Sequence, residues 1–231
     1  MLDWARHQTA RPGTWASRLG LDVWGLGPGS WCPMPGSCSL AQLFDTDRVP
    51  EGFQYRAQFI TYDEQHDLVS AIERVEFSTF EMRSVVARRR VAFFGASYKS
   101  GDAPAGPIPQ FLSALRERAA EWAGVHPEDF AMALINEYRQ GAPIGWHRDA
   151  PQYGIIAGIS LLSSCRMKLR PYVPPSDART SGRAAPRRTT HEITLEPRSA
   201  YLITGPARSE FEHSIPATTA LRYSITFRTL R

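Results

Sequence analysis

From Phe130 to the C-terminus, the chain is divided into short segments whose apolar residues recur at the spacing of β-strands. Turn residues separate seven of these segments: residues 131–138, 153–162, 166–170, 192–195, 200–204, 211–215 and 221–229. A run of short strands without intervening helices closes into a two-sheet sandwich or a barrel. This half of the chain therefore predicts a core built from strands.

Two helices are expected ahead of these strands. Thr61 and Glu64 have the spacing of a capping box, in which each side chain satisfies a free backbone N–H at the start of a helix. A second helical pattern covers residues 108–122 and ends before Gly124. A strand pattern at residues 53–59 precedes both. Helices followed by strands indicate an α+β chain with a jelly-roll core and supporting N-terminal helices.

The first part of the chain has a different composition. Residues 1–47 hold four of the six tryptophans, and glycine and proline interrupt every candidate element. We expect a loosely ordered extension at residues 1–47 and one domain at residues 48–231. Met34 is a second candidate for the natural start. Residues 171–190 are rich in proline, arginine and serine and predict a long basic surface loop between two strands.

The composition indicates which partners and which cellular compartment suit the protein. The net charge is +4 and the basic residues are clustered, which would attract a polyanion. Three sparse cysteines favour a reducing cytoplasm. The N-terminus lacks a basic region followed by an apolar stretch, and the apolar run at residues 153–162 is too short to span a bilayer. We expect a cytoplasmic protein, a monomer, without membrane contact.

His147 and Asp149 are candidate metal ligands. They lie two residues apart, so on an extended backbone their side chains project to the same side. His213, in another predicted strand, could supply a third ligand. Two imidazoles and one carboxylate leave coordination positions open, which suits Fe(II) better than structural zinc. The alternative is a pair at the end of a strand that hydrogen-bonds to the backbone.

The last predicted strand has one polar and one apolar face. The polar face carries Arg222, Ser224, Thr226 and Arg228. If the apolar face packs outward against a helix or a second sheet, the two arginines point inward and need anions. A guanidinium matches a carboxylate, so a dicarboxylate cosubstrate could supply them. Asn136 and Tyr138 could donate to the same acid. The alternative is an edge strand with solvated arginines.

Six short motifs follow one another along the chain: Asn-x-Tyr at 136–138, Gly-Trp-His-Arg-Asp at 145–149, Pro-Gln-Tyr-Gly at 151–154, Gly-Pro-Ala-Arg at 205–208, His-Ser-Ile-Pro at 213–216 and Arg-Tyr-Ser-Ile-Thr-Phe-Arg at 222–228. In this order, they resemble the AlkB family of Fe(II)/2-oxoglutarate dioxygenases. The resemblance runs from about residue 53 to residue 231. It implies a double-stranded β-helix core. It also implies that the protein uses Fe(II), 2-oxoglutarate and O2.

The resemblance also assigns residues to these cofactors. It implies iron on His147, Asp149 and His213. It implies 2-oxoglutarate on Arg222, assisted by Asn136, Tyr138, Ser224 and Arg228, with Ser224 standing where the family often has asparagine.

Residues 88–95 and Tyr98 are similar to the family's segment that covers a target base. Aromatic side chains beside basic ones can stack a flipped base and hold its phosphates, so we expect substrate contacts from Arg90, Phe94, Tyr98 and Arg148. The alternative is that Phe93 and Phe94 belong to the core and the arginines are solvated.

The activity implied by the resemblance is oxidative dealkylation of N-alkylated bases in DNA or RNA. It would be coupled to decarboxylation of 2-oxoglutarate to succinate and CO2, with release of formaldehyde. One alternative is a 2-oxoglutarate-dependent hydroxylase or demethylase of a protein side chain or small molecule. Another is a nucleic-acid-binding module that keeps the fold without catalysis.

Overall fold

The computed structural model of the chain describes residues 49–82, 85–96, 105–174 and 189–231. All of them belong to the compact unit Phe44–Arg231. The predicted extension at residues 1–47, Tyr98 and residues 175–188 of the basic loop lie outside the described residues. The boundary near residue 48 and the choice of Met34 as a start therefore stay predictions.

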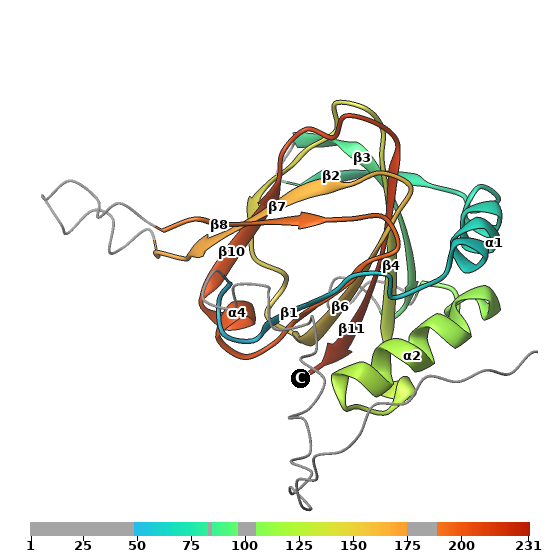
Figure 1. The fold of residues 1–231 in the computed structure, drawn as a ribbon, viewed down its shortest axis with the longest axis horizontal. Helices are drawn as coiled ribbons and strands as arrows, with labels where there is room; N and C mark the ends of the chain where they lie inside the picture. Colours follow the sequence, from blue (N-terminus) through green and yellow to red (C-terminus); the bar gives the residue numbers. More distant parts are fainter. Residues whose placement is uncertain (1–48, 83–84, 97–104, 175–188) are drawn as a thin grey trace, which may run out of the picture. The chain divides into compact units, whose positions relative to one another are not determined.

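Two antiparallel sheets form the body of the domain (Figure 1). The major sheet has the order β1 (Phe53–Arg56), β9 (Ala200–Ile203), β6 (Tyr153–Leu161), β11 (Arg222–Leu230), β4 (Met132–Tyr138), β3 (Val85–Gly95) and β2 (Ser78–Met82). The minor sheet has the order β5 (Ile144–His147), β10 (Phe211–Ile215), β7 (Cys165–Pro171) and β8 (His191–Leu195). Apolar side chains from both sheets, among them Ile156, Tyr201, Met167 and Ile215, form a shared core.

Two helices lie together against the major sheet (Figure 1). Helix α1 (Tyr62–Ile72) begins with the predicted capping box, in which the N–H of Thr61 donates to Glu64 and the N–H of Glu64 donates to Thr61. Helix α2 (Ser113–Ala123) follows a 3-10 turn, η3 (Gln110–Leu112), and ends at Gly124 with φ +68°. Leu68, Ile72 and Leu115 bury the apolar faces of the helices against the sheet.

Strand β11 has the two faces that its sequence predicts. Tyr223, Ile225 and Phe227 belong to the core under the helices. Each such side chain contributes roughly 1.5–3 kcal/mol when fully buried. The polar residues of the strand therefore point to the other side, between the two sheets. Because β11 lies between β6 and β4, the alternative of an edge strand with solvated arginines is wrong.

The remaining predicted strands agree with the structure within two residues, with one exception. The segment predicted at 53–59 ends at Arg56, because Gln58 adopts a left-handed φ of 50°. Among the strands and α-helices of the described residues, four were not predicted: β2, β3, β5 and the short helix α4 (Gly205–Ser209). The predicted loop at residues 171–190 lies between β7 and β8, as expected, and these two strands pair with each other. Within the described part of the chain, no helix is long and apolar enough to cross a membrane.

Candidate metal centre and adjoining pocket

The two candidate histidines face each other across neighbouring strands. His147, at the end of β5, is the register partner of His213 on β10, and the centroids of their rings are 4.3 Å apart. Nδ1 of His147 lies 2.9 Å from the carbonyl oxygen of Gly145. Donation from Nδ1 to this carbonyl fixes the tautomer and leaves Nε2 as the atom that can bind a metal.

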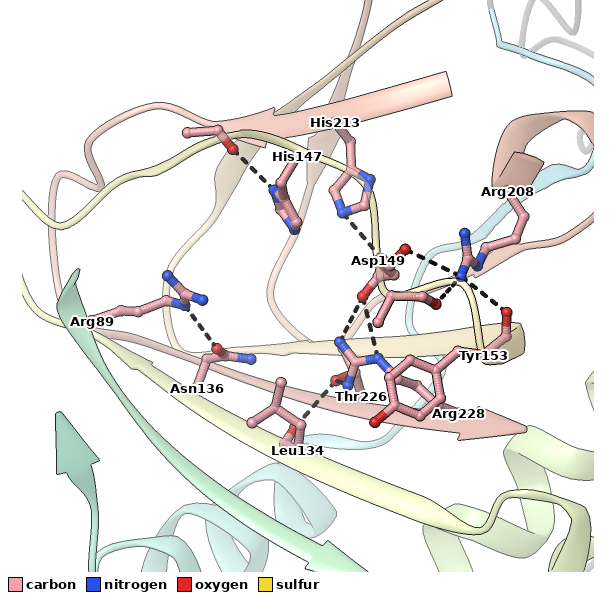
Figure 2. Close-up of polar contacts among 12 residues, drawn as sticks. Arg89, Leu134, Asn136, His147, Asp149, Tyr153, Arg208, His213, Thr226 and Arg228 are labelled. Carbon is pink, nitrogen blue, oxygen red and sulfur yellow. Dashed lines mark hydrogen bonds and ion pairs between the residues drawn. The ribbon is translucent and has the colours of Figure 1, made fainter. Parts of the chain in front are cut away.

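Asp149 joins the histidines from the loop that follows β5. Its Oδ2 lies 3.6 Å from Nε2 of His213, and one ligand atom from each of the three residues falls within 4.8 Å of the others. Figure 2 shows the three side chains converging. The sequence argument assumed an extended pair, but β5 ends at His147 and only the histidine belongs to the strand. His147 and Asp149 are therefore not a separate pair at the end of a strand, because they form a three-residue cluster with His213.

The protonation states of this cluster suit a metal. Burial lowers the pKa of His147, and it lowers the pKa of His213 to about 3, an effect strengthened by the neighbouring His147. Both imidazoles are therefore neutral near pH 7, with a lone pair available. Burial alone would raise the pKa of Asp149, but Arg228 together with the neighbouring His213 and His147 outweighs this effect and holds that pKa well below its usual range.

Two arginines fix the carboxylate and its loop. Arg228 donates from Nε and Nη2 to Oδ1 of Asp149, at 3.2 and 3.0 Å (Figure 2). Arg208, buried on α4, donates from Nη2 to the backbone carbonyls of Ala150 and Tyr153 at 2.7 and 2.9 Å. The loop after β5 is thereby tied to the body of the domain, and Oδ2 of Asp149 stays available.

Arg222 is a buried cation with unused donors. The residue is 0% exposed, and its Nε donates to Oγ of Ser160 at 3.0 Å. Nη1 and Nη2 have no hydrogen-bond partner among the described residues. A buried guanidinium without an anion is costly, because desolvation is not offset by a paired charge. An acid that offers two oxygens in a fork would satisfy both groups.

The three-residue cluster and Arg228 border one pocket. It is lined by His147, Asp149 and His213 and also by Asn136, Tyr138, Ser224, Thr226 and Arg228, and its volume is about 110 Å³. At roughly 10–15 Å³ for each water-sized group, this volume has room for a small organic diacid. The ring of Tyr138 connects the pocket to Arg222, whose Cζ lies 5.2 Å from the ring centroid. Burial raises the pKa of Tyr138, so its hydroxyl stays protonated and can donate.

The donor set and the pocket can be compared with known proteins. A family model described as the 2OG-Fe(II) oxygenase superfamily matches residues 52–228 of the chain, from before β1 to the last arginine of β11. The chain belongs to this superfamily. Its members use Fe(II), 2-oxoglutarate and O2, so the predicted dioxygenase class and cofactors are confirmed at the level of the family.

Comparison with individual proteins confirms the resemblance to the AlkB family. A curated Arabidopsis thaliana protein, the "Alkylated DNA repair protein ALKBH8 homolog", is 25% identical over 197 residues, covering 78% of this chain and 55% of the relative. The chain thus spans about half the length of this relative. The solved structure of OsALKBH1 has a TM-score of 0.57 at 14% identity, with 78% of this chain and 99% of that chain covered. It shares the jelly-roll fold.

A second solved structure, a prolyl-4-hydroxylase of Pseudomonas putida, has a TM-score of 0.49 at 14% identity. That match covers 78% of this chain and 93% of the other.

Strand β3 presents different residues to the pocket of this oxygenase from those that the sequence suggested. Arg89 and Phe93 line the pocket, whereas Arg90 and Phe94 lie on the other face of the strand. Arg90 is held there by Glu137 through Nε and Nη2. Successive residues of a strand point to opposite faces, so an error of one residue selects the wrong side. The structure therefore does not bring Arg90 and Phe94 to the pocket.

Arg148 lines the pocket, and its contact with a substrate stays a prediction. Its guanidinium stacks 4.5 Å from the ring centroid of Tyr172 and donates to the carbonyl of Ser209 at 2.8 Å.

Sequence reasoning missed Arg89 and gave Arg208 no role. Nε of Arg89 donates to Oδ1 of Asn136 at 3.2 Å, which orients the amide and turns its NH2 group toward other acceptors (Figure 2). The pairing of β3 with β4 sets which face of β3 is inward, and that pairing is not visible in the sequence. Arg208 lies in the Gly-Pro-Ala-Arg motif, so the motif did indicate its importance.

Proposed function

We propose that this oxygenase removes N-alkyl groups from bases of DNA or RNA by oxidation. The observation that carries the proposal is the cluster of His147, Asp149 and His213 beside a pocket that adjoins the unpaired guanidinium of Arg222. An open three-ligand centre and a site for a diacid are the two requirements of this chemistry.

In this proposal, His147, Asp149 and His213 would hold Fe(II), with Nε2 of each imidazole and Oδ2 of the carboxylate as ligands. Neutral imidazoles and an ionised carboxylate support the assignment. Arg228 would keep the carboxylate oriented by occupying its other oxygen.

Arg222 would bind the distal carboxylate of 2-oxoglutarate, because its two terminal nitrogens offer a fork for which the described residues supply no acceptor. Tyr138 and the amide of Asn136 would donate to the same molecule. Ser224 and Arg228 line the pocket on the β11 side and would complete the polar wall. The pocket volume supports a molecule of this size.

When bound, iron and 2-oxoglutarate supply the oxidant that puts one oxygen atom of O2 into a C–H bond of the alkyl group, while the other oxygen atom enters succinate and CO2 is lost. For an N-methyl group, the hydroxymethyl product then breaks its C–N bond and leaves as formaldehyde, and the base nitrogen regains a proton. The protein contributes orientation and exclusion of water.

The nucleic-acid substrate is supported by two observations. The A. thaliana relative is named as an alkylated DNA repair protein. In addition, Arg148 at the pocket is stacked on an aromatic ring and could contact a phosphate. A cytoplasmic location and a monomeric state remain predictions.

Mass spectrometry of alkylated DNA and RNA oligonucleotides, incubated with the protein, Fe(II), ascorbate and 2-oxoglutarate, tests the proposal. Loss of an alkyl group, with succinate formed above the low rate seen without a substrate, would support it, with Asp149→Ala as the inactive control. A rise in succinate formation with a peptide or small molecule alone would transfer the activity to the alternative substrate class. No succinate under any condition would exclude the oxygenase reaction.

A further inference from the structure

Tyr201, on β9, is a buried tyrosine whose side chain faces the space between the two sheets. It is 6% exposed, and it lines the pocket together with Tyr138. Its ring stacks on Phe53 of β1, with the ring centroids 6.0 Å apart and the planes 9° from parallel. A buried tyrosine has an apolar ring that packs in the core and a hydroxyl that needs a polar partner. The family resemblance gave this residue no role.

A glycine on the neighbouring strand sets the position of the phenol. Tyr201 pairs in register with Gly158 of β6. A Cβ added to Gly158 would lie 2.2 Å from Cζ of Tyr201 and 2.5 Å from its hydroxyl oxygen, so the phenol occupies the space of the missing side chain. Because β6 lies between β9 and β11 in the sheet, the hydroxyl extends over β6 in the direction of β11.

The same face of β6 holds the guanidinium of Arg222. Ser160 follows Gly158 by two residues, so both belong to one face of the strand. Oγ of Ser160 accepts a hydrogen bond from Nε of Arg222 at 3.0 Å. The phenol of Tyr201 and the guanidinium of Arg222 are thus anchored at adjacent positions along β6.

Tyr201 is a hydrogen-bond donor at neutral pH. Burial raises the pKa of its hydroxyl, and the guanidinium of Arg222 opposes this effect without overcoming it. Among the charged groups, Arg222 has the largest effect on this pKa, which agrees with the adjacent positions of the two side chains. A protonated phenol beside a guanidinium can donate to the same carboxylate as that guanidinium.

We infer that Tyr201 is a further cosubstrate-binding residue, whose hydroxyl donates to the distal carboxylate that Arg222 would bind. The inference rests on the cosubstrate site of the proposed function and adds a residue to it. Arg222 would reach the carboxylate from β11, and Tyr201 would reach it from β9. A hydrogen bond to a charged group changes an affinity roughly 10- to 100-fold.

Tyr201→Phe removes the hydroxyl and keeps the ring over Gly158. The dissociation constant of 2-oxoglutarate should rise at least about tenfold in this variant. Calorimetric titration of the Mn(II)-loaded protein without O2 measures it. The affinity for Mn(II) should not change, because the three residues of the candidate metal centre are intact.

Tyr55→Phe is the matched control. Tyr55 is the register partner of Tyr201 on β1, but it is 36% exposed and lies outside the lining of the pocket. Its hydroxyl accepts from the backbone N–H of Glu196 at 3.3 Å, so this variant also loses a hydrogen bond. The dissociation constant of 2-oxoglutarate should be the same in Tyr55→Phe and in the natural protein.

A second ligand locates the contact at the distal carboxylate. 2-Oxopentanoate has the carbon chain of 2-oxoglutarate with a methyl group in place of that carboxylate. Its weaker binding should be equal in Tyr201→Phe and in the natural protein, because the hydroxyl has no carboxylate to contact. A general disturbance of the pocket by the variant would instead weaken the binding of both ligands.

The outcomes separate this inference from the proposed function. A loss of affinity in Tyr201→Phe that is confined to 2-oxoglutarate supports the inference. Equal affinity for 2-oxoglutarate in this variant and the natural protein overturns it, and so does an equal loss for both ligands. Weaker binding of 2-oxoglutarate by Arg222→Met then leaves the proposed cosubstrate site standing. If Arg222→Met binds 2-oxoglutarate as tightly as the natural protein, that site and the inference both fail.

Discussion

Arg228 and Asp149 are joined by two hydrogen bonds that end on the same oxygen. Nε and Nη2 of the arginine both reach Oδ1 of the carboxylate, so Oδ2 alone faces His213 (Figure 2). The family resemblance implied a cosubstrate role for Arg228, and in the structure its partner is a carboxylate of the candidate metal centre. The pair leaves Oδ2 of Asp149 as the oxygen that would bind a metal.

The first prediction concerns this pair. Arg228→Lys keeps the charge but loses the two-nitrogen fork, so Asp149 should be less well oriented and metal affinity should fall roughly 10- to 100-fold. Titration of the metal-free protein with Co(II) measures the change. Arg118→Lys, which alters a similar fork with Glu64 between the two helices, should bind Co(II) as tightly as the natural protein. Equal affinity in Arg228→Lys would contradict the role of the pair.

The second prediction concerns Arg222. Because its terminal nitrogens are buried with no acceptor in the part of the chain that the structure describes, Arg222→Met should not lower the free energy of unfolding of the protein in the absence of 2-oxoglutarate. The same variant should lose the rise in melting temperature that 2-oxoglutarate causes in the presence of Mn(II). Thermal unfolding with and without the diacid measures both effects. If the variant is still stabilised as strongly as the natural protein, Arg222 is not the site of the diacid.

The third prediction concerns a close approach in the wall of the pocket. A Cβ added to Gly158 on β6 would lie 2.2 Å from Cζ of Tyr201, whose ring lines the pocket. Gly158→Ala should therefore lower the free energy of unfolding by roughly 1–3 kcal/mol through overpacking. Urea unfolding measures it. Gly106→Ala, where a Cβ meets no atom within 4 Å, is the control, and equal stability of the two variants would refute the account.

The fourth prediction is a pH dependence. Burial lowers the pKa of His213 to about 3, whereas an unfolded histidine titrates near 6.5. Below pH 6.5 the unfolded chain therefore binds more protons at this residue than the folded chain, and stability falls as the pH falls. Between pH 7 and pH 5 the metal-free protein should lose roughly 2 kcal/mol from this group.

Urea unfolding at both pH values in a chelator tests this prediction. His213→Gln should lose less stability between them than the natural protein. His126→Gln changes an exposed histidine that precedes the turn at Pro127–Asp129 and should behave like the natural protein. A loss in His213→Gln as large as that in the natural protein would show that the buried imidazole does not cause the effect.

Much of the fold could be predicted from local patterns. The faces of β11, the capping box of α1 and the end of α2 at Gly124 each depend on neighbouring residues, and the structure confirms them. The convergence of His147 and His213 required pairing between β5 and β10, which lie far apart in the sequence. That convergence was inferred from the residue types and the family resemblance, because spacing alone could not supply it.

The error at β3 has a different cause. Arg88, Arg89 and Arg90 in succession mask the alternation of the strand, so its inward face could not be chosen from composition. Only the pairing of Val91 with Asn136 establishes that Arg89 and Phe93 face the pocket. Long-range register therefore decided which face of β3 borders the pocket, just as the pairing of β5 with β10 decided the convergence of the two histidines.

Conversion of 2-oxoglutarate to succinate tests the central assignment most directly. The natural protein with Fe(II) and O2 should form succinate even without an alkylated substrate, at a low rate. Asp149→Ala should abolish this conversion at all concentrations of 2-oxoglutarate. Arg222→Met should show part of the natural rate, and only at high concentrations of 2-oxoglutarate. Undiminished succinate formation by Asp149→Ala would contradict the assignment of His147, Asp149 and His213 as the iron site.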